Sequence, residues 1–178
     1  ELLKAVIEAA MLTNYRFDRY KSSKPPKRLS EITVIEKQPS KKTVQAVSSA
    51  ATLAQAVMTA RDLVNEPANV IYPETLAKKA SELGRKHGFV TQIFNEKEIA
   101  KLKMDAFLAV SRASVKKPRL IVMRYTGDPS KKEDITALVG KGLTYDSGGL
   151  ALKQADGMKN MKNDMAGSAA VIGAMCAI

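Results

Sequence analysis

Two lysines and two aspartates lie close together in a glycine-rich stretch that runs from Leu138 to Gly167 of the 178-residue chain. In chain order they are Lys141, Asp146, Lys153 and Asp164. The chain has one histidine and one cysteine, so it cannot build a zinc site from several Cys and His ligands, and a nucleophilic Ser or Cys could use only His87 as its base. Any metal would therefore be held mainly by carboxylates and less usual ligands, a donor set that is typical of hydrolysis or of a structural ion.

Residue types alone leave other interpretations of this stretch open. A dinucleotide-binding loop is disfavoured because Tyr145 occupies the position where a third glycine would follow the Gly-x-Gly of residues 140–142. A phosphate-binding loop is disfavoured because the glycines at 148–149 do not lead into a Gly-Lys-Ser/Thr sequence. The ordinary interpretation remains that the two lysines are surface residues paired with the two aspartates, since exposed ion pairs are common.

The elements that position this stretch are expected to alternate between strand and helix, which is typical of an α/β fold. Apolar periodicity, helix caps and apolar runs predict helices over residues 2–20, 42–64, 74–87, 95–103 and 164–178, and strands over residues 32–35, 89–94, 107–110, 119–125 and 135–139. The polar residues 21–28 are expected to form an exposed connector. The last two strands read as nearly continuous apolar runs, so we expect a mixed, mainly parallel sheet flanked by helices. Residues 135–139 would then deliver residues 140–142 to the carboxyl end of a strand, where α/β folds usually build ligand sites.

Two blocks of the sequence carry a resemblance to a known family. The first reads VGKGLTYDSGGLALK followed by GMKNMKNDMAGSAAVIG, and the second reads ARDLVNEPANVIYPETLA, at Ala60–Ala77. Both resemble the leucyl aminopeptidase family (the cytosol aminopeptidases), and the resemblance extends more weakly over about Thr43–Ile178. It implies that residues 1–40 are the end of a smaller N-terminal α/β domain and its connector. Residues 41–178 would then be the N-terminal half of the catalytic domain.

The resemblance also implies a role for each polar residue of the stretch. Lys141, Asp146 and Asp164 would be ligands of two divalent metal ions, with Asp146 bridging them. Mn or Zn would be the ions, and Mg or Co are also used in the family. Lys153 would be the catalytic lysine, and Met161 would line the pocket for the first side chain of the substrate. These roles are chemically consistent, because a dication lowers the pKa of a ligating lysine, whereas a lysine that stabilises an oxyanion must stay cationic.

By the same resemblance, the activity would be that of a two-metal aminopeptidase that releases N-terminal residues, preferably leucine, from peptides. The family assembles as a homohexamer in the cytoplasm. Its further acidic block, Asn-Thr-Asp-Ala-Glu-Gly-Arg, supplies the remaining ligands and an arginine, and this block does not occur in the 178 residues. The chain starts at Glu1 and ends on the apolar stretch Ala174–Ile178, which indicates an excerpt of a longer protein. We therefore expect this chain alone to be inactive.

Charge and composition limit the other function classes. The formal net charge is +11, but the basic residues are scattered in short pairs, Trp is absent and aromatic residues make up 5%, so a nucleic-acid interface is poorly supplied. No apolar run approaches the ~20 residues that span a bilayer, and a lone cysteine favours a reducing compartment such as the cytoplasm. Two alternatives stay open: a non-catalytic or nucleic-acid-binding relative on the same scaffold, and a phosphate-ester hydrolase that uses carboxylate-held metals.

Overall fold

The structure is a computed structural model that describes residues 1–23, 27–131 and 133–178. The connector predicted at residues 21–28 falls partly outside the described residues, and its described part is exposed. The elements, in chain order, are α1 (Leu2–Thr13), α2 (Lys41–Asn65), α3 (Pro73–His87), β1 (Val90–Phe94), α4 (Glu96–Lys101), α5 (Asp105–Ser111), β2 (Leu120–Arg124), α6 (Ala155–Met158), the 3-10 helix η1 (Met161–Asn163) and α7 (Ala166–Ala177).

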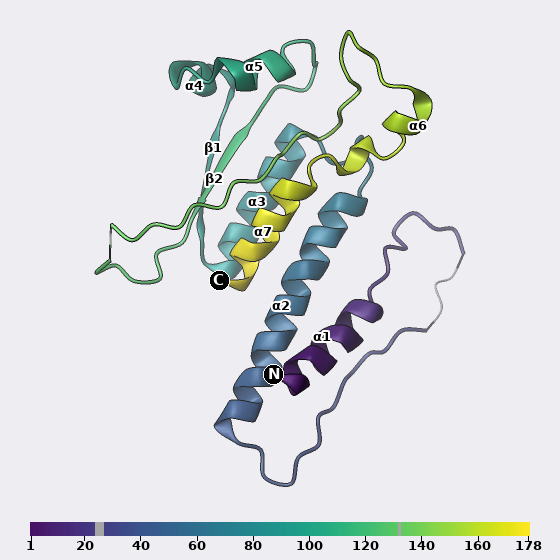
Figure 1. The fold of residues 1–178 in the computed structure, drawn as a ribbon, viewed down its shortest axis with the longest axis vertical. Coiled ribbons are helices and arrows are strands. Elements are labelled where there is room, and N and C mark those ends of the chain that lie inside the picture. Colours follow the sequence, from purple (N-terminus) through teal and green to yellow (C-terminus); the bar gives the residue numbers. More distant parts are fainter. Residues whose placement is uncertain (24–26, 132) are drawn as a thin grey trace.

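Three helices form the centre of the molecule. α7 lies between α2 and α3 and contacts both of them (Figure 1). α1 packs against α2 on the side away from α3, and the β1–β2 pair lies against α3. η1, which leads into α7, contacts α2. This arrangement brings the segment that precedes α7 to the long helix α2.

The long helix α2 follows from its local sequence. Ser40 caps its N-terminus by accepting a hydrogen bond from the Thr43 amide at 3.1 Å. The helix interior is rich in alanine, the strongest helix former. The helix ends at Asn65 because Glu66 precedes a proline and takes an extended conformation, with φ −60° and ψ 142°. The helix predicted over residues 42–64 is thus confirmed to within one residue at each end.

Caps also account for α3 and α4, as predicted. Pro73 is the first residue of α3, and Gly88 ends the helix with a φ of +84°, in the left-handed region that glycine adopts without steric cost. Asn95 accepts hydrogen bonds from the amides of Lys97 and Glu98. The Glu98 carboxylate accepts one from the Asn95 amide in return, which completes a capping box at the start of α4.

The core lies where α2, α3 and α7 meet. Its buried side chains are Leu63, Ile71, Leu76, Ala80, Met165, Ala169 and Ile172. Small residues let α7 approach α2 closely, because a Cβ added to Gly173 would lie only 2.9 Å from the carbonyl oxygen of Ala56. Cys176 is buried in a neighbouring apolar cluster, and this burial raises the pKa of its thiol. The cysteine is therefore packed as a small hydrophobic residue.

The sheet consists of β1 and β2, which pair antiparallel with Val90 opposite Arg124 and Phe94 opposite Leu120. The predicted α/β class is confirmed. The mainly parallel arrangement is not seen, since the sheet within the described residues has these two antiparallel strands. The physical reason is the connection, in which α4 and α5 return the chain beside β1 in the opposite direction.

Three predicted strands are wrong. Residues 32–35 and 135–139 form no strand, because neither has a partner strand in the described part of the chain to complete a hydrogen-bonded ladder. Their apolar side chains are instead exposed, with Ile35 92% and Val139 95% accessible. Residues 107–110 belong to α5, since a short apolar run fits a helix as well as a strand.

Two predicted helices have different bounds. The helix predicted over residues 2–20 ends at Thr13, because the side chain of the next residue, Asn14, bonds to the backbone of Leu29. Its amide donates to the Leu29 carbonyl at 3.0 Å, and its carbonyl oxygen accepts from the Leu29 amide at 3.1 Å. The helix predicted from residue 164 begins at Ala166 as α7 and is preceded by η1.

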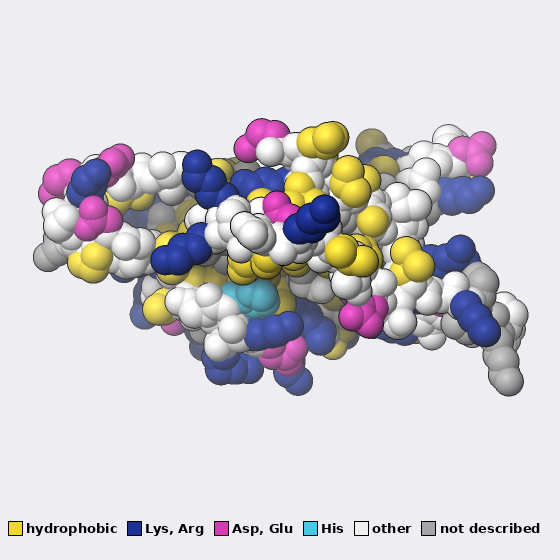
Figure 2. Space-filling model, turned by 90° about the horizontal axis from the view of Figure 1, so that it is seen from below, with side chains coloured by type: hydrophobic (Ala, Val, Ile, Leu, Met, Phe, Trp, Pro, Cys, Tyr) yellow, Lys and Arg dark blue, Asp and Glu magenta, His cyan; other side chains and the backbone are white. Residues whose placement is uncertain are grey.

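The surface carries mixed charge. On the face drawn in Figure 2, Lys and Arg side chains are dispersed among acidic and apolar ones rather than gathered into one stripe. The helices that the structure describes include none with the length and apolar character needed to cross a membrane.

Candidate functional site

The backbone around Lys141 is held against the start of α7. The carbonyl of Lys141 accepts a hydrogen bond from the Ser168 amide at 2.8 Å. A Cβ added to Gly140 would lie 2.4 Å from the carbonyl oxygen of Gly167, and a Cβ added to Gly167 would lie 2.8 Å from the Lys141 nitrogen. Two glycines are thus required for this approach. Because they lack side chains, the Lys141 segment can lie against the start of α7, although the strand predicted before it does not form.

The side chain of Lys141 reaches Asp164, which lies between η1 and α7. Its Nζ is 2.9 Å from Oδ1 of Asp164. The lysine side chain is 61% exposed, whereas the aspartate side chain is only 17% exposed. The other carboxylate oxygen of Asp164, Oδ2, is buried and has no hydrogen-bond partner among the described residues. Asp164 therefore keeps unused acceptor capacity away from solvent.

Asp146 and Lys153 form a second ion pair, with 2.8 Å between the lysine Nζ and Oδ2 of the aspartate. The Gly148 amide donates to Oδ1 of Asp146, also at 2.8 Å. These two hydrogen bonds, with the Lys153 bond the stronger cause, hold the pKa of the Asp146 carboxyl below its ordinary value, and the charge of Lys141 lowers it further. The turn between the pair depends on Gly148, whose φ is +88° and whose added Cβ would lie 2.3 Å from the Ala151 oxygen.

Met161 contacts the second pair. Its Sδ lies 3.0 Å from the Nζ of Lys153, so this ammonium touches both a carboxylate and a thioether. Met161 is the first residue of η1, and its carbonyl accepts a hydrogen bond from the Asp164 amide at 3.3 Å. The two ion pairs are therefore joined through η1, and each of the five residues predicted for the site contacts another member of the set.

This arrangement tests the interpretation that the lysines are ordinary surface residues. The structure has both ion pairs, as that interpretation requires. A solvated pair does not account, however, for a buried carboxylate oxygen without a partner, since burial of such an atom costs free energy unless another group satisfies it.

The donor set fits a divalent cation. Carboxylate oxygens are ligands for hard and borderline cations, and Oδ2 of Asp164 is free to accept one. Over the described ranges, no group of three or more His, Cys, Asp or Glu side chains lies close enough to hold a metal. The ligand set that the resemblance implies adds the amine of Lys141 to the carboxylates of Asp146 and Asp164.

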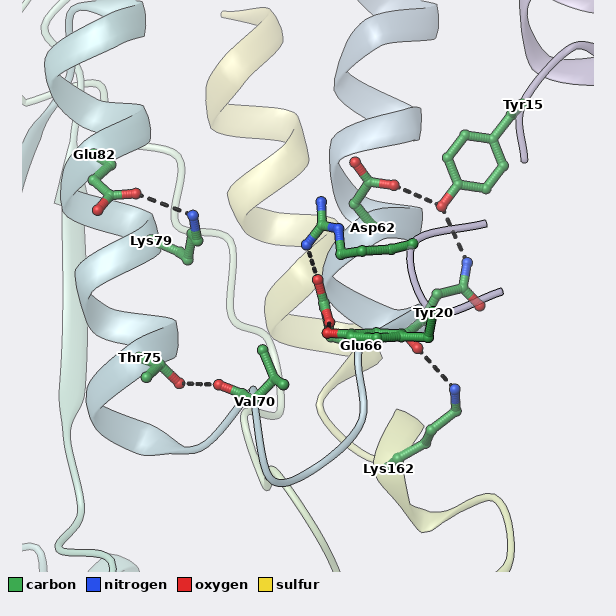
Figure 3. A network of polar contacts seen from close by, with 11 residues as sticks. Tyr15, Tyr20, Asp62, Glu66, Val70, Thr75, Lys79, Glu82 and Lys162 are labelled. Carbon is green, nitrogen blue, oxygen red and sulfur yellow. Dashed lines mark hydrogen bonds and ion pairs between the residues drawn. The ribbon is translucent and has the colours of Figure 1, made fainter. Parts of the chain in front are cut away.

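A polar network that includes Lys162 was not singled out by the sequence (Figure 3). Lys162, inside η1, donates from Nζ to the backbone carbonyl of Asn65 at 2.8 Å. The side chain of Asn65 donates to the Tyr15 hydroxyl at 3.1 Å, and that hydroxyl donates to Asp62 at 2.7 Å. Lys162 is one of 29 basic residues, and its partner lies 97 positions away, so no local pattern distinguishes it.

Comparison with known proteins gives consistent matches. The sequence model of the cytosol aminopeptidase family, catalytic domain, matches residues 58–178. A probable cytosol aminopeptidase from Clostridium perfringens is 49% identical over 182 residues, which cover 99% of this chain and 36% of that protein. A mutant of tomato leucine aminopeptidase superimposes with a TM-score of 0.82 at 31% identity, over 98% of this chain and 33% of that one.

A third similar protein is the bottromycin maturation enzyme BotP in complex with Mn. Its TM-score is 0.81 at 35% sequence identity, and the match covers 98% of this chain and 35% of that one. This chain therefore spans about a third of the length of the proteins it matches. The family model nevertheless covers more than half of the chain and includes all five residues predicted for the site. The chain belongs to the cytosol aminopeptidase family.

Proposed function

We propose that this chain supplies the first part of the active site of a two-metal aminopeptidase. The full-length protein, in which the chain is continued to the length of its relatives, would release N-terminal residues, preferably leucine, from peptides. The observation that carries the proposal is Asp164, whose buried Oδ2 has no partner among the described residues and whose Oδ1 pairs with Lys141. Family membership supports the reaction class, because relatives are named cytosol aminopeptidases.

Lys141, Asp146 and Asp164 are the residues proposed to hold the two metal ions. When bound, the ions would activate water and polarise the scissile carbonyl. Mn is supported by the Mn complex of one structural neighbour, and Zn, Mg or Co are the other candidates. Lys141 must give up its proton to ligate, and Asp164, which now pairs with its ammonium, would remain beside it.

Lys153 is the proposed catalytic residue. Its ammonium is oriented by Asp146 and by the sulfur of Met161, so it is held in one place before substrate arrives. A cation fixed in this way would stabilise the oxyanion that develops on the attacked carbonyl, at roughly 3–4 kcal/mol for one well-placed donor. Met161 would line the pocket for the first substrate side chain, and its contact with Lys153 would keep that pocket next to the reacting carbonyl.

The remaining parts of the active site are proposed to lie beyond this chain. The Asn-Thr-Asp-Ala-Glu-Gly-Arg block of the family does not occur in the 178 residues. We therefore propose that residues 1–178 alone do not turn over substrate, and that residues 41–178 belong to the catalytic domain while residues 1–40 end a smaller one. A homohexamer in the cytoplasm is proposed for the full-length protein on the same family basis.

The test compares hydrolysis of leucyl-p-nitroanilide by the full-length protein and by residues 1–178, each with Mn²⁺ or Zn²⁺. We expect turnover by the full-length protein only. In that protein, Lys153→Ala should lower kcat by about 10²–10³-fold and leave the metal content nearly intact. The control is Lys78→Ala, which removes an exposed lysine on α3 and should change neither quantity. Hydrolysis of phosphate esters instead of amino-acid amides would refute the proposed reaction, and loss of metal in Lys153→Ala would refute the role of Lys153.

A further inference from the structure

The C-terminus of α2 lacks a cation of its own. The last carbonyl groups of a helix have no intrahelical partner and carry partial negative charge, which a nearby cation stabilises. The last turn of α2 contains no Lys, Arg or His, and it includes the acidic Asp62. The cation comes instead from Lys162, whose Nζ donates to the carbonyl of Asn65, the final residue of the helix, at 2.8 Å.

Lys162 lies in the segment that carries two of the proposed site residues. η1 spans only Met161–Asn163, and its backbone bonds are few: the Asn163 amide donates to Asn160 at 3.0 Å and the Asp164 amide to Met161 at 3.3 Å. So short a 3-10 turn is not stable by itself and needs contacts from outside. The Lys162–Asn65 bond is such a contact. Lys162 lies between Met161 and Asp164 in the sequence, so the bond acts on the backbone that carries both site residues.

The acceptor of this bond is itself held in place (Figure 3). The Asn65 side chain donates to Tyr15, and Tyr15 donates to Asp62 one turn earlier in α2. The next residue, Glu66, is 4% exposed, and its carboxylate accepts hydrogen bonds from Arg19 and Tyr20. The end of α2 is thus fastened on one side by the segment that follows α1, and on the other side it binds Lys162.

We propose that Lys162 is a positioning residue, which fixes η1 to the C-terminus of α2 and thereby sets the places of Met161 and Asp164. The inference rests on the proposed function, because it assigns Lys162 a purpose only if Asp164 binds metal. The ammonium joins two segments that neighbour each other only in the folded chain. Without it, η1 keeps its packing on α2, the backbone bonds of a single turn, the burial of Met165 and the side-chain contacts of Met161 with Lys153 and of Asp164 with Lys141, but it loses its hydrogen bond to the end of α2.

The test uses the full-length protein with Lys162→Met, Lys162→Arg and the control Lys159→Met. Lys159 is exposed and lies on the same segment, so its replacement removes an equal charge without this contact. We expect Lys162→Met to weaken Mn²⁺ binding, measured by calorimetric titration, about tenfold, and to raise KM as well as lower kcat. Lys162→Arg keeps a cationic donor, so its Mn²⁺ affinity, KM and kcat should lie within about threefold of those of the unsubstituted protein. Lys159→Met should change none of these three quantities.

Two outcomes of the Mn²⁺ titration of the Lys162 variants would overturn the inference. One is unchanged Mn²⁺ affinity in a folded Lys162→Met variant, and the other is failure of the arginine variant to restore the affinity that the methionine variant loses. If Lys162→Met does not fold, Tyr15→Phe decides instead, because it loosens Asn65 while Lys162 stays. A two- to fivefold loss of Mn²⁺ affinity in Tyr15→Phe supports the inference, and no loss overturns it.

Hydrogen exchange separates this inference from the proposed function. The amides of Asn163 and Asp164 should exchange faster in Lys162→Met and at the normal rate in Lys162→Arg. If the unsubstituted protein neither binds Mn²⁺ nor hydrolyses amino-acid amides, the proposed function fails, yet this exchange pattern still supports the positioning of η1. If the exchange rates are the same in all variants, the positioning fails whatever the activity.

Discussion

The close contact between the backbones of Gly140 and Gly167 can be tested by substitution, and the test shows whether this contact positions Lys141. In Gly140→Ala, the new Cβ would lie 2.4 Å from the Gly167 oxygen, whereas ordinary contacts begin near 3.4 Å. Because the obstacle is backbone, no rotamer change can relieve it, and the two segments must separate by about 1 Å, the difference between these distances. That movement would stretch the 2.8 Å bond from Ser168 to Lys141 beyond hydrogen-bonding range.

The expected cost follows from these two effects. Overpacking costs about 1–3 kcal/mol, and the lost hydrogen bond adds about 0.5–1.5 kcal/mol to the loss in free energy of unfolding. Displacement of Lys141 by about 1 Å should also lower kcat/KM of the full-length protein about 10²-fold, since catalytic groups tolerate little misplacement. Urea denaturation measures the first quantity, and leucyl-p-nitroanilide hydrolysis measures the second.

Gly142→Ala is the matched control, because it adds the same methyl group two residues away. Its Cβ would meet the Ser168 side chain at 3.5 Å, which is an ordinary van der Waals distance. We expect it to change stability by less than about 0.5 kcal/mol and to leave kcat/KM within a factor of three. Equal stability and activity of the two alanine variants would show that the close approach of these segments does not exist, and the account of how Lys141 is positioned would be wrong.

Two further predictions concern the scaffold around the site. Ile172→Ala removes a core side chain that is 1% exposed, and it should lower the free energy of unfolding, measured by urea denaturation, by about 2–5 kcal/mol. Ile135→Ala, at a residue that is 81% exposed, should change this free energy by less than about 0.5 kcal/mol. Equal losses in the two variants would contradict the described core. Burial, and after it the hydrogen bond to Asp62, raises the pKa of Tyr15 above its ordinary value of 10.0, so the folded state holds this proton more tightly than the unfolded state does. The resulting stabilisation is complete below pH 10 and is lost as pH rises through the folded-state pKa, so a urea series between pH 9 and 11.5 should show a decline that Tyr15→Phe lacks.

Local signals in the sequence were sufficient to predict α2, α3 and α4. Ser40, Pro73, Gly88 and Asn95 each act at a helix end through contacts within a few residues, so their effect can be read without knowing the rest of the fold. Strands have no such local determinant. Residues 135–139 are mostly apolar and include three β-branched side chains, but a strand exists only when another segment completes its hydrogen bonds, and the described chain offers them none.

The candidate site was predictable for a different reason. Lys141, Asp146, Lys153, Met161 and Asp164 lie within 24 residues of one another, and their types and spacing resemble one family. The roles given to them remain predictions, while their mutual contacts are features of the structure. The contact between Lys162 and Asn65 could not be predicted, because it depends on the antiparallel packing of α7 against α2 and joins residues 97 positions apart.

These contacts indicate which parts of α2 matter to the site. The site residues lie in loops and in the short helix η1, so their positions depend on two attachments, the glycine contact at the start of α7 and the bond from Lys162 to the end of α2. Both attachments lie at the end of the molecule where α2 finishes and α7 begins. A change at the C-terminal end of α2 should therefore reach the site, while an equal loss of stability near Ser40, at its N-terminal end, should lower stability alone. Site geometry and global stability can thus be changed separately, because the C-terminal end of α2 positions the site residues, whereas the whole length of α2 contributes to the free energy of unfolding.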